Sequence, residues 1–491
     1  MRLLDALRLS DYRSAGSLSA PCLAFVGAGG KTGAIFSLAR EILEVGQSNS
    51  VFVTTTTHLG IQQVELTDRH VQVESFEDLA GLENETMTGV IALIAPLSQL
   101  VERESGPAVA GLDGEFLERL HVLALRLNIP LLIEADGSRL RPLKAPAAHE
   151  PAVPGWVDAV VVVAGLKGLG MPLSDVTVHR PEIFSNLTGI ALGEAVTPTA
   201  LVRLLSQPAG GLKNIPAQAR KVVLLNTYKA DHQLPHVQKM ALELLQTFDA
   251  VIAAEVPAAA EVPVVTQIPL TAQLTTKSEV STVHAVHERV AGIILAAGAA
   301  QRFGEGIGQP RAKQLLPWRG EPLVRHVARV ALASGLDPVI VVTGAFEAEV
   351  RQALAGLPVQ FAHNSSWLEG QSQSILAGLR FCTGDRSIAE SAGGAVFMLA
   401  DQPQIPPTLV RLLIEQHAGS LAPIVAPLVA GWRANPVLFD RSTFRELMSL
   451  SGDVGGRSLF QRYPVSWVPW LDESVLLDVD TPEDYERLQQ L

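Results

Sequence analysis

The sequence contains little cysteine and few aromatic residues. Two cysteines occur among 491 residues, and Phe, Trp and Tyr together account for 5% of the chain. Cys22 and Cys382 lie far apart in the sequence, so we expect neither a disulfide framework nor a pair of metal ligands, and this usage favours a reducing cytoplasm. Because aromatic side chains are so few, the hydrophobic cores must be built from Ala, Val, Leu and Ile.

Positive charge and long hydrophobic runs are also scarce. Lys and Arg number 38 against 50 Asp and Glu, which gives a formal net charge of −12. This balance argues against a nucleic-acid partner, but a nucleotide needs only a few local cations. No apolar run approaches the roughly 18 residues of a membrane span, and the N-terminus lacks the apolar core of a signal peptide. The sequence therefore predicts a cytoplasmic protein without a membrane partner.

Both halves of the chain alternate short apolar runs with helical patterns. The predicted strands of the first half are residues 23–26, 51–53, 131–133, 160–163 and 222–225. Those of the second half are residues 292–295, 338–342, 359–362, 395–399 and 423–427. Such alternation predicts an α/β protein with two doubly wound, mainly parallel sheets, P-loop-like at the N-terminus and Rossmann-like at the C-terminus. Ligands of such sheets bind at the carboxyl ends of strands.

A segment rich in Ala, Val, Thr and Pro separates the two halves. We expect domains at residues 1–255 and 289–491, with residues 256–288 between them. The weak helical periodicity of this segment favours a linker that includes a last strand of the first domain, but an ordered edge segment of one larger domain explains it almost as well.

A loop of small residues follows the first predicted strand of the second half. Such residues let backbone N–H groups approach a phosphate chain closely. The loop alone could also serve helix packing, but the basic residues that follow it favour phosphate binding. The candidate nucleotide-binding residues are Leu295, Ala296, Ala297, Gly298, Arg302, Gly304 and Lys313.

Carboxylates follow two further apolar runs of the second half. Asp401 comes after residues 396–400, and Asp478 and Asp480 come after a predicted strand at 475–477, where we expect them to share one strand face. Aspartate is an oxygen ligand suited to Mg²⁺, and strand ends in such sheets face the ligand crevice. Asp401, Asp480 and Asp478 are therefore candidate metal ligands, although a helix cap or turn explains Asp401 equally well.

The order of these motifs resembles the nucleotidyltransferase family that includes molybdenum cofactor cytidylyltransferase. The resemblance covers nearly all of residues 290–491 and includes LAAG, RFG, KQLLPW, residues 364–372, LADQP, NPVLF, GDVGGR and LLDVDTPEDY. It implies Mg²⁺-dependent transfer of CMP from CTP to molybdopterin, the organic part of the molybdenum cofactor. On this hypothesis the catalytic residues are Arg302, Lys313, Asp401 and Asp480.

Three details leave parts of this hypothesis open. Ala297 carries a methyl group where related guanylyltransferases usually have Gly, which favours cytosine by about 1–3 kcal/mol. An insert at residues 305–312 leaves either Arg311 or Lys313 as the phosphate-binding cation, and Asn435 stands where the family usually has His. The alternatives are a transferase for guanylyl, sugar phosphate or alditol phosphate substrates, and a non-catalytic protein that delivers the cofactor.

A glycine-rich turn also follows the first predicted strand of the first half. Together with the helical pattern after it, this turn predicts a phosphate-binding loop for ATP or GTP, although its spacing departs from the standard motif and a packing turn is the alternative. Asp136 ends another predicted strand and could hold Mg²⁺ there, or simply form an Asp-Gly turn. The candidate residues of the loop are Gly27, Gly29, Gly30, Lys31 and Thr32.

These N-terminal motifs, with residues 144–151 and 179–182, resemble the YqeC family. The resemblance covers about residues 1–250, and the family is named as accessory to selenium-dependent molybdenum hydroxylases. It implies an association with the maturation of an apo molybdenum hydroxylase and brings no established reaction. Both resemblances therefore lead to one pathway.

Overall fold

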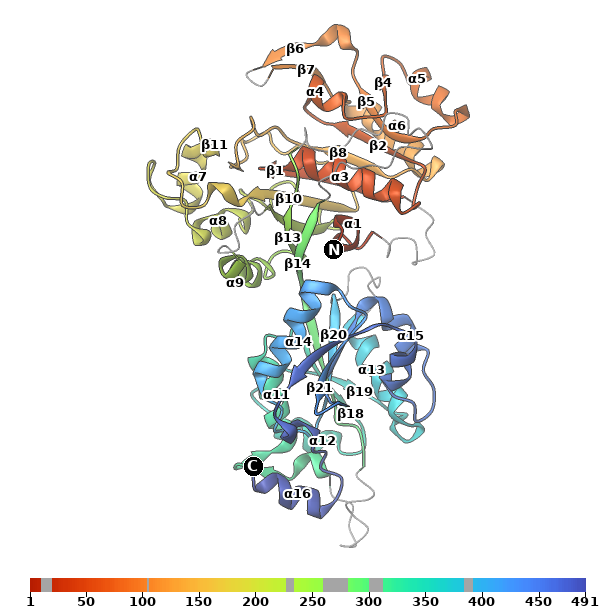
Figure 1. The fold of residues 1–491 in the computed structure, drawn as a ribbon, viewed down its shortest axis with the longest axis vertical. Helices are drawn as coiled ribbons and strands as arrows, with labels where there is room; N and C mark the ends of the chain where they lie inside the picture. The colour runs from red at the N-terminus through yellow and green to blue at the C-terminus, as the bar shows by residue number, and fades with distance from the viewer. Residues whose placement is uncertain (10–19, 104–105, 227–233, 259–280, 300–311, 384–391) are drawn as a thin grey trace. The chain divides into compact units, whose positions relative to one another are not determined.

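A computed structural model of the chain describes residues 1–9, 20–103, 106–226, 234–258, 281–299, 312–383 and 392–491 (Figure 1). Contacts divide the chain into two compact units, Met1–His287 and Glu288–Leu491. Arg302, Gly304 and Arg311, which the sequence proposes as phosphate ligands, lie outside the described residues.

The first unit is built on a sheet of nine strands in the order β14-β13-β12-β10-β1-β8-β2-β5-β4. From β13 to β4 every pairing is parallel. Their interiors are apolar on both faces, as parallel strands covered by helices require. The strands are β1 Cys22–Ala28, β2 Ser50–Thr55, β4 Arg69–Gln72, β5 Gly89–Ile94, β8 Leu131–Glu134, β10 Ala159–Gly165, β12 Arg220–Asn226, β13 Ala250–Glu255 and β14 Thr282–Glu288.

Helices cover both faces of this sheet. One face packs on α6 Gly114–Leu127, α7 Pro181–Thr188, α8 Pro198–Leu205 and α9 Leu234–Leu244, whose side chains share one core with Cys22, Ala24 and Val26. The other face packs on α3 Lys31–Glu44, against which α1 Leu3–Ala6 lies. The smaller elements are β3 His58–Gly60, α4 Ile61–Val64, α5 Phe76–Gly81, β6 Val101–Arg103, β7 Gly106–Ala110, β9 Leu143–Lys144 and β11 Val178–His179.

The second unit contains a mixed sheet in the order β19-β18-β15-β20-β23-β21-β22, and β24 pairs with β21. Strands β19, β18, β15 and β20 are parallel, and β23 is antiparallel to both β20 and β21. The strands are β15 Val290–Leu295, β18 Val339–Thr343, β19 Gln360–His363, β20 Gly394–Leu399, β21 Ile424–Val429, β22 Trp432–Arg433, β23 Val437–Asp440 and β24 Val465–Trp470, with a small hairpin of β16 Pro317–Trp318 and β17 Glu321–Pro322.

Alternate residues of β15 join two separate cores, so this sheet is also covered on both faces. Val290 and Ile294 pack with α11 Leu323–Ala333, α12 Glu347–Ala353 and α14 Pro407–Ser420. Ala291 and Ile293 pack on the opposite face with α13 Gln371–Thr383 and α15 Phe444–Met448. Helices α13 and α15 lie on one side of the sheet in Figure 1, and α11 and α14 on the other. The chain ends in α16 Pro482–Gln489.

The α/β fold expected from the sequence is confirmed, and one predicted strand is wrong. The ten strands expected from the alternating pattern are all present, and the one that is absent is the additional strand expected at residues 475–477. The apolar run before Asp478 is instead a 3₁₀ turn, η11 Glu473–Leu476, so Asp478 and Asp480 do not share a strand face. Val475 is buried in the core although it belongs to this turn, which explains why the local sequence has the apolar pattern of a strand. In the segment between the halves, Thr282–Glu288 is an edge strand of the first sheet.

Each sheet has one position where the direction of strand connection reverses. In the first unit the chain runs from β1 towards β2 and β5, and later returns to β10 on the other side of β1. In the second unit it runs from β15 to β18 and β19, and then returns to β20. Ligands of doubly wound sheets bind at this crevice, beyond the carboxyl ends of the two strands. The two candidate sites below lie at these positions.

Candidate nucleotide sites

A cavity of about 290 Å³ lies beyond the carboxyl ends of β15 and β20. It is close to the lower end of the range found for small-molecule sites, roughly 300 Å³. Six residues proposed from the sequence line it: Leu295, Ala296, Ala297, Gly298, Lys313 and Asp401. The other lining residues are Gln314, Trp367, Gly370, Gln371, Ser374, Leu399, Ala400 and Asp453.

Lys313 lies between two of the carboxylates proposed as metal ligands. Its ammonium is 2.6 Å from Asp480 Oδ1 and also contacts Asp401 Oδ2. Burial alone would lower the pKa of Lys313, but the charges of Asp401 and Asp480 raise it overall, so the lysine stays protonated. It is the only lysine in residues 288–491.

Asp401 has one carboxylate oxygen without a partner. Its Oδ2 contacts Lys313, whereas Oδ1 is buried and accepts no hydrogen bond from any described residue. A buried carboxylate oxygen without a donor is costly. Such an oxygen, with Asp480 nearby, is the type of ligand that Mg²⁺ prefers. The residues thus fit a hard divalent cation, on the condition that Lys313 moves.

Asp478 is held next to this group by a hydrogen bond from the Gln402 side chain. Burial raises the pKa of the Asp478 carboxyl to about 6, and the charges of Asp401 and Asp480 add to the rise. The residue itself is solvent-exposed, so water screens part of this effect. Among the described residues, no group of three His, Cys, Asp or Glu is arranged to hold a metal ion.

Several lining residues carried no role in the sequence prediction. Gln314 donates through Nε2 to the Ala296 and Gly298 carbonyls at 3.2 and 3.4 Å and so holds the small-residue loop. Trp367, Gln371 and Asp453 belong to segments that carry the family resemblance, which was the available signal for them. Ser374 lines the cavity because it lies on the side of α13 that faces it. The local sequence gives no sign of which side of this helix faces the cavity.

The methyl group of Ala297, on which the choice of base rests, packs at the edge of the cavity. Ala297 is 4% exposed and belongs to the core beneath α13. A Cβ on Gly344 would lie 2.9 Å from the Ala297 Cβ and 2.6 Å from its carbonyl oxygen. Gly344 therefore makes room for Ala297, and the two residues together fix the shape of this wall.

The glycine-rich turn of the first unit has a backbone that only glycine adopts readily. Gly27, Gly29 and Gly30 have φ values of 93°, 83° and 132°. A Cβ on Gly27 would meet the Val163 carbonyl oxygen at 2.2 Å, and one on Gly30 would meet the Asn226 amide at 2.4 Å. Close packing between β1, β10 and β12 is therefore sufficient to require these glycines, whether or not a phosphate binds.

Lys31 and Asp136 form a buried ion pair beside this turn. Lys31 Nζ lies 3.0 Å from Asp136 Oδ1 and donates to the Gly27 carbonyl at 2.7 Å, and both charged side chains are 2% exposed. Burial alone would lower the pKa of Lys31, but Asp136 and Glu134 raise it overall. The Thr32 hydroxyl donates to Glu134 at 3.1 Å.

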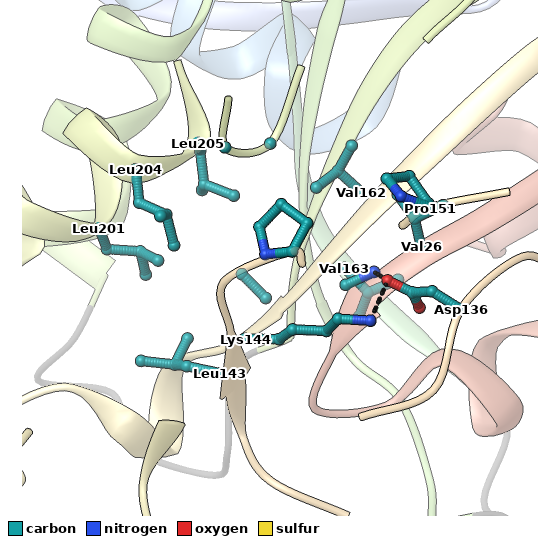
Figure 2. A pocket seen from close by; sticks show the side chains of 15 residues that line it. Val26, Asp136, Leu143, Lys144, Pro151, Val162, Val163, Leu201, Leu204 and Leu205 are labelled. Carbon is teal, nitrogen blue, oxygen red and sulfur yellow. Dashed lines mark hydrogen bonds and ion pairs between the residues drawn. The ribbon is translucent and has the colours of Figure 1, made fainter. Parts of the chain in front are cut away.

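A second lysine contacts the same carboxylate. Lys144 Nζ donates to Asp136 Oδ2 at 2.8 Å (Figure 2). It also donates to the Gly137 carbonyl at 2.6 Å and pairs with Glu150 at 2.9 Å. Burial would raise the pKa of Glu150, but hydrogen bonds from Arg180 and Lys144 lower it to about 2. All three hydrogens of the Lys144 ammonium therefore have acceptors.

The cavity beside this network measures only about 30 Å³, room for a water molecule or two rather than a nucleotide. Leu201, Leu204 and Leu205 line it opposite Asp136 and Lys144 (Figure 2). Both polar atoms of the Asn226 side chain already have partners within the protein. Its Nδ2 donates to the Gly29 carbonyl at 2.8 Å, and its Oδ1 accepts from Val256 N at 3.0 Å.

Both units are thus doubly wound α/β sheets, and the second has an open cavity at the position where its strand connections reverse direction. Residues 292–467 match the MobA-like NTP transferase domain, and residues 23–182 match the YqeC protein family. Within the described residues, no helix is long and apolar enough to cross a membrane.

Three relatives illustrate these matches. The uncharacterized protein YqeC of Escherichia coli is 35% identical over 42% of this chain and 75% of its own length. Nicotine blue oxidoreductase of Paenarthrobacter nicotinovorans is 34% identical over 40% of this chain and 96% of its own length. A probable molybdenum cofactor guanylyltransferase of Bacillus cereus is 27% identical over 30% of this chain and 66% of its own length. The chain belongs to the YqeC family in its first part and to the MobA-like NTP transferase family in its second, which makes the second part a nucleotidyltransferase domain.

Proposed function

We propose that the second unit transfers CMP from CTP to the terminal phosphate of molybdopterin, giving molybdopterin cytosine dinucleotide and pyrophosphate. The observation that carries this proposal is the cavity that joins the 295–298 loop, Lys313 and Asp401. The family membership supports nucleotidyl transfer. The choice of CTP rests on the Ala297 methyl group and the choice of acceptor on the family.

The small-residue loop and Lys313 bind the triphosphate. Backbone N–H groups at Ala297 and Gly298 donate to phosphate oxygens, because both residues line the cavity and carry little side chain. Lys313 releases Asp480 and turns its ammonium to the leaving pyrophosphate. Arg302 and either Arg311 or Lys313 supply the positive charge of this proposal, and Gly304 completes the small-residue loop; of these four residues only Lys313 is among the described residues.

The carboxylates of Asp401 and Asp480, with Asp478 beside them, hold Mg²⁺ in this proposal. A bound Mg²⁺ would supply positive charge to the α-phosphate oxygens in the transition state. The free Oδ1 of Asp401 is the natural first ligand, because it is buried and lacks a donor. Departure of Lys313 towards the phosphates frees the second oxygen of Asp401.

The reaction needs no general base from the protein. The acceptor is a phosphate monoester, which is already ionised near neutral pH. One of its oxygens forms a bond to the α-phosphorus of CTP while the bond to the bridging oxygen breaks, and pyrophosphate carries away the electron pair. The protein contributes orientation and charge stabilisation, which are the main terms in phosphoryl transfer chemistry.

The test is incubation of the protein with molybdopterin, Mg²⁺ and each of the four ribonucleoside triphosphates, with pyrophosphate release as the readout. Release with CTP alone supports the proposal, and Asp401→Asn should reduce it by a factor of about 100 or more. Full turnover of Asp401→Asn would contradict the assignment of Asp401. Release with GTP alone, or with a sugar or alditol phosphate as acceptor, would replace the substrates but keep the reaction class.

A reductase is the second candidate, because a relative that aligns over 96% of its length is named nicotine blue oxidoreductase. The same preparation, incubated with nicotine blue and NADH or NADPH, tests it through absorbance at the nicotinamide band. A protein that binds molybdopterin tightly, releases no pyrophosphate and oxidises no nicotinamide would be a delivery protein for an apo molybdenum hydroxylase.

For the first unit we propose binding of ATP or GTP at Gly27, Gly29, Gly30, Lys31 and Thr32, with Asp136 as a Mg²⁺ ligand. In support, Gly30 caps α3, so the free N–H groups of that helix start beside Lys31. Binding requires Lys31 to leave Asp136, since its ammonium is now held by the Asp136 carboxylate and the Gly27 carbonyl. Titration with fluorescent ATP and GTP analogues tests it, and unchanged affinity in Lys31→Met would contradict it.

A further inference from the structure

Arg433 and Arg457 lie on the same side of one short helical turn. The Arg433 guanidinium carbon is 4.5 Å from the centre of the Phe460 ring. Phe460 and Arg457 both belong to η10 Gly456–Gln461, three positions apart. In a 3₁₀ helix, side chains three residues apart project in the same direction, so Arg457, which is exposed, leaves the turn on the same side as Phe460.

The two arginines lack a compensating carboxylate. Among the described residues, neither is within ion-pair distance of an Asp or Glu. Burial lowers the pKa of Arg433, and the like charge of Arg457 lowers it further. Adjacent guanidinium groups without a counter-charge repel one another, and an anion placed between them removes that cost.

Strand register places Arg433 at the edge of the sheet that carries Asp401. Strand β21 runs in the same direction as β20, because each is antiparallel to β23. Strand β24 pairs with one side of β21, so β22 and β23 both lie along the other side, where β22 continues the line of β23. Arg433 of β22 pairs with Leu428, near the carboxyl end of β21. Arg433 thus lies about one strand spacing, roughly 5 Å, from the line of β20.

The same register fixes the face on which Arg433 lies. Leu428 shares a strand face with Ala426 and Ile424, which belong to the core beneath α13 and α15. Leu295 and Trp367 of the nucleotide cavity pack against that core as well. The segment before Arg457 also reaches the cavity, since Asp453 lines it. The loop, Asp401 and the arginine pair therefore follow one another along a single edge.

We propose that Arg433 and Arg457 bind the attacking phosphate monoester of the acceptor. This inference rests on the proposed nucleotidyl transfer. In an in-line displacement, the attacking oxygen and the leaving pyrophosphate lie on opposite sides of the α-phosphorus. With pyrophosphate at the 295–298 loop and the α-phosphate at Asp401, the entering phosphate belongs on the far side, where the two arginines are. Planar guanidinium groups are suited to two-point contact with phosphate oxygens.

Steady-state kinetics with CTP and molybdopterin test this assignment. Arg433→Met and Arg457→Met should each raise KM for molybdopterin at least tenfold and leave KM for CTP within twofold. The matched control is Arg462→Met, because Arg462 follows the same turn but is exposed and already paired with Glu446. Near-UV circular dichroism and the melting temperature establish that each variant is folded.

Binding of inorganic phosphate provides a readout that does not depend on turnover. The wild-type protein should bind phosphate in calorimetry, phosphate should compete with molybdopterin, and Arg433→Met with Arg457→Met should abolish both effects. A double variant that keeps KM for molybdopterin and phosphate binding overturns the assignment. Absence of transfer by the wild type with any nucleotide, with phosphate binding still dependent on the two arginines, would instead overturn the proposed reaction.

Discussion

The ammonium of Lys313 lies 2.6 Å from Asp480 Oδ1 and at the same time contacts Asp401. The residue proposed to bind phosphate therefore neutralises the residues proposed to bind the metal. Lys31 and Asp136 repeat this relationship in the first unit, 3.0 Å apart. In each unit, binding of a metal-nucleotide complex would exchange partners, with the lysine moving to phosphate and the carboxylate to metal.

Replacing Lys313 separates these two roles. Lys313→Met should lower the rate of transfer by a factor of about 100 or more, because it removes a charge from the phosphates. Binding of Mn²⁺ without nucleotide, followed by electron paramagnetic resonance, should be as tight as in the wild type or tighter, since the carboxylates lose their competitor. Lys313→Arg keeps the charge and is the control for packing. Wild-type turnover in Lys313→Met would remove Lys313 from the mechanism.

Replacing Ala297 tests the basis for CTP selection. Ala297→Gly should raise kcat/KM for GTP relative to CTP by about tenfold, as expected for one methyl group in a pocket. The ratio of the two values, measured by pyrophosphate release, is the readout. Gly344 faces the methyl group and stays unchanged, so the wall gains space only at position 297. An unchanged ratio would mean that base selection lies elsewhere in the cavity.

The strands could be predicted from the sequence more accurately than the elements that contribute residues to the candidate site. Parallel strands buried on both faces are continuous apolar runs, so β1, β10 and β15 could be recognised locally. The same criterion misassigned the segment at Val475, where one apolar residue enters a core from a 3₁₀ turn. A buried segment can be recognised in the local sequence by its apolar residues, but these residues do not show whether a strand or a turn carries them.

Residues brought together by topology could not be predicted from spacing. Gln314 holds the 295–298 loop through backbone carbonyls, and Asp453 reaches the cavity from a distant segment. Lys313 was predicted as a phosphate ligand, yet its contact with Asp480 spans 167 residues. Only the order of the strands makes such contacts possible, and strand order is a property of the whole chain.

Removing Lys31 distinguishes a structural role from a nucleotide-binding one. Lys31→Met leaves Glu134 and one oxygen of Asp136 buried without their cation, which should cost about 3–5 kcal/mol of stability in the first unit. Hydrogen–deuterium exchange of a peptide covering Cys22–Ala28 measures this loss. Lys239→Met, an exposed position on α9, is the control and should change stability by less than about 0.5 kcal/mol. Unchanged exchange in Lys31→Met would show that the ion pair contributes little to the fold.

Glu41 gives the first unit a pH dependence that is independent of both sites. The residue is 2% exposed, and although its carboxyl accepts a hydrogen bond from Leu4 N at 2.8 Å, burial raises the pKa of Glu41 to about 7. The protonated form is thus favoured in the folded state. Its stabilising contribution is complete below the ordinary glutamate pKa and is lost as the pH rises through 7.

Glu41→Gln should remove this dependence, because glutamine is neutral at every pH and can still accept the Leu4 hydrogen bond. The variant should therefore be more stable than the wild type at pH 8, by at most about 3 kcal/mol, and the two should converge near pH 5. Hydrogen–deuterium exchange of peptides covering Leu3–Ala6 and α3, measured across that range and corrected for intrinsic exchange rates, gives the comparison. Glu44→Gln changes an exposed residue of the same helix and should follow the wild-type profile. A wild-type protein that is as stable as Glu41→Gln at pH 8 would mean that the carboxylate is solvated where it lies.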